Sequence, residues 1–300
     1  MSENNNKTTN VAELSTKYKK KSQMADIFKR LCRNKTAVMG AIVVIILLLM
    51  AIFADVLHDY ETEVIKQDIM SRLQSPSAEH WFGTDEMGRD IFARVCYGAK
   101  YSLLISFVAA VISLAIGLVL GALAGYYGGW VDMIIMRVMD VLLAIPGTLL
   151  AIAIVASLGS SISNLIIALS VSGIPGFSRI VRSSVLTIKD SEYVEAAKAI
   201  GATDATIIFK HVLPNGMAPL IVQSTLRVAN VILSTAGLSF LGLGVPAPHP
   251  EWGAILSNAR SYIRDYSYMA LFPGLAIMIT ILCLNLLGDG LRDALDPKLK

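Results

Sequence analysis

Long, predominantly apolar runs alternate with shorter polar segments along this chain of 300 residues. A helix needs about 20 such residues to cross the hydrocarbon core of a bilayer, and the chain offers several runs of about that length. The sequence therefore predicts an all-α integral membrane protein with six transmembrane helices. The six runs lie at 36–54, 101–125, 133–156, 164–180, 216–238 and 266–287.

Several local signals refine these spans. Gly173-Ile174-Pro175-Gly176 predicts a break inside the fourth run, and Gly288-Asp289-Gly290 predicts the end of the last helix. The segment 242–265 is too polar and too rich in proline to span. A long polar segment precedes 36–54 and no small-residue cleavage site follows it, so we expect an anchor and not a signal peptide.

Composition supports a membrane protein and excludes several other classes. Hydrophobic residues make up 54% of the chain and charged residues 16%, against about 25% charged in soluble domains. The net charge is only +3 and basic residues are not interleaved with aromatic ones, so nucleic acid is not an expected partner. Three scattered cysteines, without a CxxC or Cys/His cluster, predict neither a disulfide framework nor a metal site: Cys32, Cys96 and Cys283.

Catalytic signatures are also missing from the sequence. The predicted spans hold no convincing Ser/His pair or pair of aspartates, which an intramembrane protease would need. The chain has no GxxxxGK[ST] phosphate-binding loop, so ATP hydrolysis would have to come from another subunit. We therefore expect a protein that is not an enzyme and that holds no cofactor of its own.

Lysine and arginine residues predict the orientation in the membrane. The first 35 residues carry nine of them and the segment 179–210 carries five, which places both segments in the cytoplasm. The segment 55–100 has nine acidic and five basic residues and is predicted to lie outside. Six crossings place both termini on the cytoplasmic side of the cell membrane.

The polar segment Glu192–Asn215 has the pattern of two short helices. Asp190 or Ser191 can cap the first helix, Gly201 can end it in left-handed backbone, and Pro214 is expected to end the second. An ordinary hairpin and a docking segment for a partner outside the bilayer both fit this pattern. Apolar residues repeat at i, i+3, i+4 and i+7 on each helix: Tyr193, Ala196, Ala197 and Ile200, then Ala205, Ile208, Phe209 and Val212.

The same segment carries a family resemblance. Glu195-Ala196-Ala197, then Gly201 and Leu213-Pro214, resembles the EAA loop of ABC-type importer permeases. The resemblance implies that a coupling loop at about 182–215 docks into a groove of a cytoplasmic ATPase. His211 departs from the general motif, where an apolar residue is usual, but it fits the peptide and nickel subgroup of these permeases.

A second stretch resembles the C-type subunits of dipeptide, oligopeptide and nickel importers. It runs from His80-Trp81-Phe82-Gly83-Thr84-Asp85 through Gly88-Arg89-Asp90 to Gly98-Ala99-Lys100-Tyr101-Ser102-Leu103. A local role, with glycine bends and an Arg89 pair to Asp85 or Asp90, accounts for this stretch. Contact with a docking substrate-binding protein is the alternative.

Two shorter stretches extend the resemblance over most of the chain from Trp81 to Pro297. They are Arg137-Val138-Met139-Asp140 with Ala144-Ile145-Pro146, and the run 238–244 with Trp252-Gly253. Thr235 departs from the subgroup, which often has glutamate there. The departure weakens the case for a cationic cargo such as nickel.

The resemblance implies a six-helix type I ABC importer permease of the MetI-like fold that moves di- or oligopeptides by alternating access. Its expected partners are a B-type permease subunit, two ABC ATPases that use ATP and magnesium, and an extracytoplasmic substrate-binding protein. A nickel or metal-chelate importer is the first alternative, and a non-transport scaffold that binds an ATPase is the second. The expected parts are a basic cytoplasmic segment, the first span with the outer loop, the permease domain and a cytoplasmic tail: 1–35, 36–100, 101–290 and 291–300.

Charged residues within the spans require partners, since each costs about 2.5 to 3.5 kcal/mol at the bilayer centre on insertion scales. Arg137 and Asp140 are three residues apart and can pair with each other. Arg227 has no acidic residue within one turn. We therefore expect its partner on another helix, on another subunit or in water, which places Arg227 on the pathway or at a subunit interface.

Overall fold

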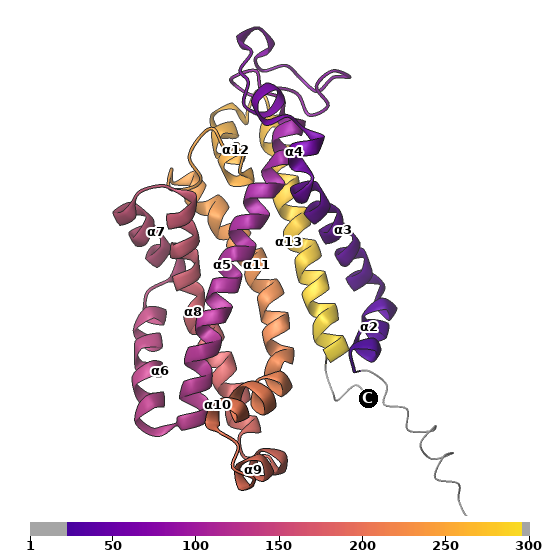
Figure 1. The fold of residues 1–300 in the computed structure, drawn as a ribbon. Helices are drawn as coiled ribbons and strands as arrows, with labels where there is room; N and C mark the ends of the chain where they lie inside the picture. The colour runs from indigo at the N-terminus through magenta and orange to yellow at the C-terminus, as the bar shows by residue number, and fades with distance from the viewer. Residues whose placement is uncertain (1–22, 296–300) are drawn as a thin grey trace, which may run out of the picture.

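A computed structural model describes residues 23–295, and these form a bundle of helices (Figure 1). The described residues contain helices and loops and no β-strand. Residues 1–22 and 296–300, parts of the predicted basic segment and tail, lie outside the described residues. The helices are α2 (Gln23–Arg33), α3 (Lys35–Ile52), α4 (Ala54–Leu57), α5 (Ile91–Tyr127), α6 (Gly129–Ala144), α7 (Gly147–Leu158), α8 (Ile162–Ile188), α9 (Glu192–Ala199), α10 (Asp204–Thr206), α11 (Met217–Phe240), α12 (Trp252–Ala259) and α13 (Tyr268–Leu295).

Short turns of other helix types complete the chain. They fall in the loops at one end of the bundle and around the polar segment between α8 and α11. They are the π-helical η1 (Tyr60–Val64) and η3 (Ile207–Val212), and the 3₁₀-helical η2 (Ile69–Ser71), η4 (Pro214–Gly216) and η5 (Arg260–Tyr262).

Six membrane crossings are confirmed, but the third is not one straight helix. Within the described residues, five helices are long and apolar enough to span, and α6 with α7 makes a sixth although the two are bent by 86°. Ile145 is extended (φ −95°, ψ 125°) and Pro146 follows it. Proline lacks an amide donor and disfavours helical backbone in the residue before it. The pair still completes a crossing, because α5 ends and α8 begins at opposite ends of the bundle (Figure 1).

Two predicted helix breaks are wrong. The helix α8 continues through Gly173 to Gly176 with Pro175 buried inside it, because α8 packs tightly along α5. A Cβ added to Gly121 of α5 would lie 2.4 Å from the carbonyl oxygen of Ser178, so glycine lets the two backbones approach.

The helix α13 likewise continues past Gly288-Asp289-Gly290 to Leu295. A Cβ on Gly290 would lie 2.1 Å from the Cβ of Ala37 on α3. These glycines therefore allow close helix packing and do not end the helix.

The bundle has two distinct ends, shown in Figure 1. The hairpin end holds α9, α10 and η3, together with α2 and the last turn of α13. The cap end holds the loops of residues 53–90 and the short helix α12, which, as expected, does not span. In the part of the chain that the structure describes, both ends of the chain therefore lie toward the hairpin end.

Candidate functional site

The polar segment forms a helical hairpin that joins α8 directly to α11. Its first helix, α9, ends at Gly201, whose φ of +82° confirms the predicted left-handed turn. Ser191 occupies the N-cap position without capping, because its hydroxyl donates to the carbonyl of Ile188 at 2.7 Å and closes the end of α8. Capping by the Ser191 side chain was thus a wrong prediction.

One side of the hairpin packs against itself. Val194 and Ala197 of α9 are buried, with 0% and 5% of their surface exposed. They belong to one core cluster with residues of η3 and of the spans α5, α8 and α11. The η3 residues in that cluster are Ile207, Ile208 and Val212.

The other side of the hairpin leaves large apolar side chains in the open. Ile200 is 85% exposed, Phe209 62% and Tyr193 45%, although sequence periodicity grouped each of them with residues that are buried. Ala196 and Glu195 are exposed as well. Exposed apolar groups at the tip of a polar segment are typical of a protein-protein contact, because water solvates them poorly.

The hairpin is also tied to the bundle. The hydroxyl of Tyr126, at the end of α5, donates to Asp204 at 2.7 Å, and the Lys198 ammonium lies 5.8 Å from the centre of the Tyr126 ring. Leu213 is buried, whereas Pro214 is exposed and begins η4, which leads into α11. Pro214 does not interrupt the helical backbone, which continues from η3 through η4 into α11. Proline is tolerated there because it stands at the first position of a helical turn. A displacement of the hairpin is therefore transmitted to α8 and α11, to which its two ends are joined.

Two ion pairs fasten α6 to α8 in the half of the bundle nearer the hairpin. Arg182 pairs with Asp132 at 2.5 Å, and Arg179 pairs with Asp140 at 2.6 Å. The predicted pair of Arg137 with Asp140 is wrong, because the carboxylate of Asp140 reaches a different helix. Sequence spacing reveals only the partners on the same helix.

Arg227 lies on α11 and reaches across to α8. Its Nη2 donates to the carbonyl oxygen of Leu169 and, at 3.0 Å, to the hydroxyl of Ser172. Its Nε is buried without a hydrogen-bond partner among the described residues. The expectation of a partner on another helix is confirmed, but that partner is neutral and leaves the charge uncompensated.

At the cap end, the glycine-rich stretch before α5 forms a compact polar turn. Arg89 Nε donates to Asp85 at 2.7 Å, both side chains being 6% exposed, so one of the two predicted pairs is confirmed. Asp90 instead caps α5 by accepting from the Ala93 amide at 2.9 Å. Gly88 has φ +73°, and a Cβ there would lie 1.7 Å from the carbonyl oxygen of Asp68. A local structural role is thus confirmed for Asp85, Gly88 and Arg89.

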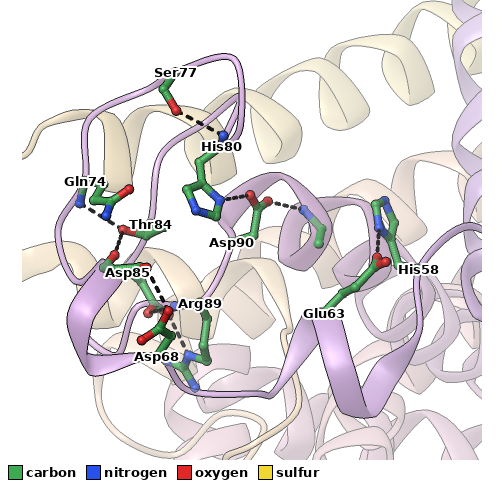
Figure 2. Close-up of polar contacts among 12 residues, drawn as sticks. His58, Glu63, Asp68, Gln74, Ser77, His80, Thr84, Asp85, Arg89 and Asp90 are labelled. Carbon is green, nitrogen blue, oxygen red and sulfur yellow. Dashed lines mark hydrogen bonds and ion pairs between the residues drawn. The ribbon is translucent and has the colours of Figure 1, made fainter.

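An open cleft of about 450 Å³ lies beside that turn. His58 Nδ1 lies 2.8 Å from Glu63, and His80 Nδ1 lies 2.8 Å from Asp90 (Figure 2). A hydrogen bond from Ser71 holds the pKa of Asp68 below its ordinary value, so this carboxyl stays ionised. The charged residues that line the cleft are mainly acidic: Glu63, Asp68, Glu79 and Asp90, with Lys66.

Sequence reasoning missed Glu251, a fully buried carboxylate at the start of α12. Its oxygens accept from the amides of Gly253 and Ala254 at 2.8 Å each, and from the hydroxyls of Ser102 and Ser239. Burial raises the pKa of Glu251, while these hydrogen bonds act in the opposite direction. Its position just before Trp252, as the N-cap of a short helix, was the signal that could have revealed it.

Comparison with known proteins identifies the class. The family model described as "Binding-protein-dependent transport system inner membrane component" matches residues 117–300, and the model "N-terminal TM domain of oligopeptide transport permease C" matches residues 22–76. The chain therefore belongs to the family of binding-protein-dependent inner membrane transport components, the ABC importer permeases. Members of this family are multi-pass, non-enzymatic membrane subunits.

Individual relatives narrow the subgroup to permeases of the dipeptide and oligopeptide C type. The chain is 49% identical over 279 residues to the dipeptide transport system permease protein DppC of Alkalihalophilus pseudofirmus, covering 93% of this chain and 91% of that protein. It is also 49% identical over 275 residues to the glutathione transport system permease protein GsiD of Escherichia coli, covering 92% and 90%.

A solved structure supports the fold alone. A chain of the MetNI methionine ABC transporter, in an inward-facing conformation, aligns with a TM-score of 0.54 and 21% identity, covering 65% of this chain and 94% of that chain. The MetI-like permease fold is thereby confirmed.

Proposed function

We propose that this chain is the transmembrane subunit through which an ABC importer moves di- or oligopeptides across the cytoplasmic membrane. In this proposal the hairpin Glu192–Asn215 docks into a groove of a separate ATPase subunit. The exposed side chains of Tyr193, Ile200 and Phe209 carry the proposal, because this chain leaves them uncovered at the tip of a polar segment.

The continuity of the hairpin with two spans provides a route for coupling. A displaced hairpin must move α8 or α11, since α9 follows α8 directly and η3 and η4 lead into α11. ATP-driven closure of the ATPases would thus rock the spans between inward-open and outward-open arrangements.

Membership of this family implies ATPase and binding-protein partners. We propose two ATPases, which bind the ATP and magnesium, a B-type permease as the second membrane subunit, and an extracytoplasmic binding protein. This chain would hold no cofactor. The acidic cleft at the cap end is a recessed polar surface that the binding protein would meet on that side.

The hairpin end is proposed to face the cytoplasm, and cysteine labelling tests this orientation. Ser77→Cys and Asn258→Cys, both exposed at the cap end, should react with an impermeant thiol reagent on intact cells. Asp204→Cys should react only after permeabilisation. Glu251 also lies at the cap end, but it is buried, so a cysteine at that position is not suitable for labelling. Labelling of Asp204→Cys from outside would reverse the orientation and remove the ATPase docking proposal. The background lacks the native Cys32, Cys96 and Cys283.

The proposed cargo is a peptide, because relatives named for dipeptide and for glutathione transport are each 49% identical to this chain. Both names refer to peptides that carry free carboxylates. Uptake of labelled dipeptide, longer peptides, glutathione and nickel by the reconstituted complex separates the cargo classes. We expect peptide uptake to exceed nickel uptake, and uptake of nickel alone would contradict the proposal.

A further inference from the structure

Arg227 lies close to the middle of α11 and carries an uncompensated charge. Among the described residues it forms no ion pair, and its contacts are to a carbonyl and a hydroxyl of α8. An arginine at this depth is strongly disfavoured against lipid. It is retained where it faces water, a ligand or a partner carboxylate.

The guanidinium is held so that part of it remains available. Nη2 is occupied by Leu169 and Ser172, and a Cβ on Gly173 would lie 2.7 Å from Nε, so glycine makes room for the group against α8. Nη1 has no partner among the described residues and is not among their buried unpaired atoms. The side chain is thus positioned in advance and keeps a free donor on its open side.

Polar residues extend from Arg227 along one face of α11. Successive spacings of four, three and four residues keep them on the same side of a helix. Asn230 is exposed and the others are partly exposed, so this chain leaves the face largely uncovered. A polar face of this kind in a span is typical of a wet pathway or a subunit interface. The residues are Gln223, Arg227, Asn230 and Ser234, which we call the α11 polar face.

The break between α6 and α7 lies beside the same place. Ile145 and Pro146 are exposed and non-helical, and a Cβ on Gly147 would lie 3.6 Å from the Cβ of Ser172. Figure 1 shows this break about midway along the bundle. Non-helical backbone at membrane depth is tolerated where protein buries it or where it lines a water-filled cavity. Both observations therefore indicate that the surroundings of Ser172 and Arg227 are shielded from lipid, by water or by a partner.

We propose that Arg227, held by Ser172 beside the α6–α7 break, binds the carboxylate of the peptide as it crosses the membrane. Guanidinium suits this ligand because it is always charged and donates in a planar fork that matches a carboxylate. This inference rests on the proposed peptide function. Movement of α8 against α11 would alter the contacts that position Arg227 and so change its affinity for the ligand.

The first test asks whether the α11 polar face is wet. In the complete reconstituted complex, without native cysteines, Asn230→Cys and Ser234→Cys should react with a charged, water-soluble thiol reagent. Ile221→Cys, on the opposite face of α11, is the matched control and should react far more slowly. Equal, slow labelling at all three positions would show a dry face and overturn the proposal.

The second test asks whether Arg227 recognises the carboxylate. Arg227→Gln should reduce uptake of labelled dialanine about tenfold, since it removes a charge-assisted hydrogen bond, while changing uptake of dialanine amide much less. The measured quantity is the ratio of dialanine uptake to dialanine amide uptake, compared between wild type and variant. Any preference of the binding protein for one of the two peptides affects both proteins equally and cancels in that comparison. Arg227→Lys should retain part of the preference for the free acid.

The outcomes separate the competing roles of Arg227. Equal loss of uptake for dialanine and its amide, or loss of co-purification with the partner permease, would make Arg227 a structural residue and overturn the carboxylate subsite. If the wild-type complex imports no peptide, the proposed function fails and the subsite fails with it. The labelling result then still shows whether the α11 polar face is wet.

Discussion

Replacing Ile200 with aspartate is expected to abolish ATP-driven uptake while the chain remains folded in the membrane. Ile200 is 85% exposed and contributes almost nothing to the hairpin's own packing. Covering an isoleucine in a partner's groove stabilises the contact by about 1.5 to 3 kcal/mol, and burying an unpaired carboxylate in its place opposes docking further. ATPase binding should weaken about a hundredfold or more.

ATPase co-purification and uptake in proteoliposomes measure this effect directly. Ile200→Leu keeps the apolar surface and is the matched control, so it should retain both ATPase binding and uptake. Normal co-purification together with normal uptake in Ile200→Asp would show that the exposed tip of the hairpin is not the docking surface.

Gly201→Val should also eliminate most uptake, but through the backbone. Gly201 has φ +82°, which β-branched residues strongly disfavour, at a cost of about 1 to 3 kcal/mol. A Cβ there would meet nothing within 4 Å, so the effect is conformational and not steric. The turn is expected to shift, which would displace Ile200 from its partner.

Asparagine at the same position provides the control, because it tolerates left-handed backbone better than other non-glycine residues. Gly201→Asn should therefore keep most of the uptake that Gly201→Val loses, with equal amounts of both proteins in the membrane. Equal activity of Gly201→Val and wild type would contradict a functional role for this turn.

Features that depend on local chemistry could be predicted from the sequence. The spans followed from the length of apolar runs, and the turn at Gly201 followed from the freedom of glycine to adopt positive φ. The Arg89–Asp85 pair is only four residues apart and was one of two pairs that spacing allowed. In each case the neighbours that determine the structure are neighbours in sequence.

Features that depend on tertiary packing could not be predicted in this way. Pro175 remains inside α8 because α5 supports that helix, whereas Pro146, which is exposed, coincides with a sharp bend. Asp140 and Arg227 find their partners on α8, which spacing along their own helices does not reveal. The periodicity of the hairpin marked its apolar residues, but packing decided that Ala197 turns inward and Ile200 outward.

The central claim is that the hairpin contacts an ATPase, and site-specific photocrosslinking tests it most directly. A photoreactive amino acid is introduced at Ile200 in the complete transporter, and at Phe107, 62% exposed on the span α5, as the control. The account predicts an ATP-binding subunit crosslinked to this chain from position 200 and not from position 107. Efficient photoreaction at position 200 without any ATPase adduct would contradict it.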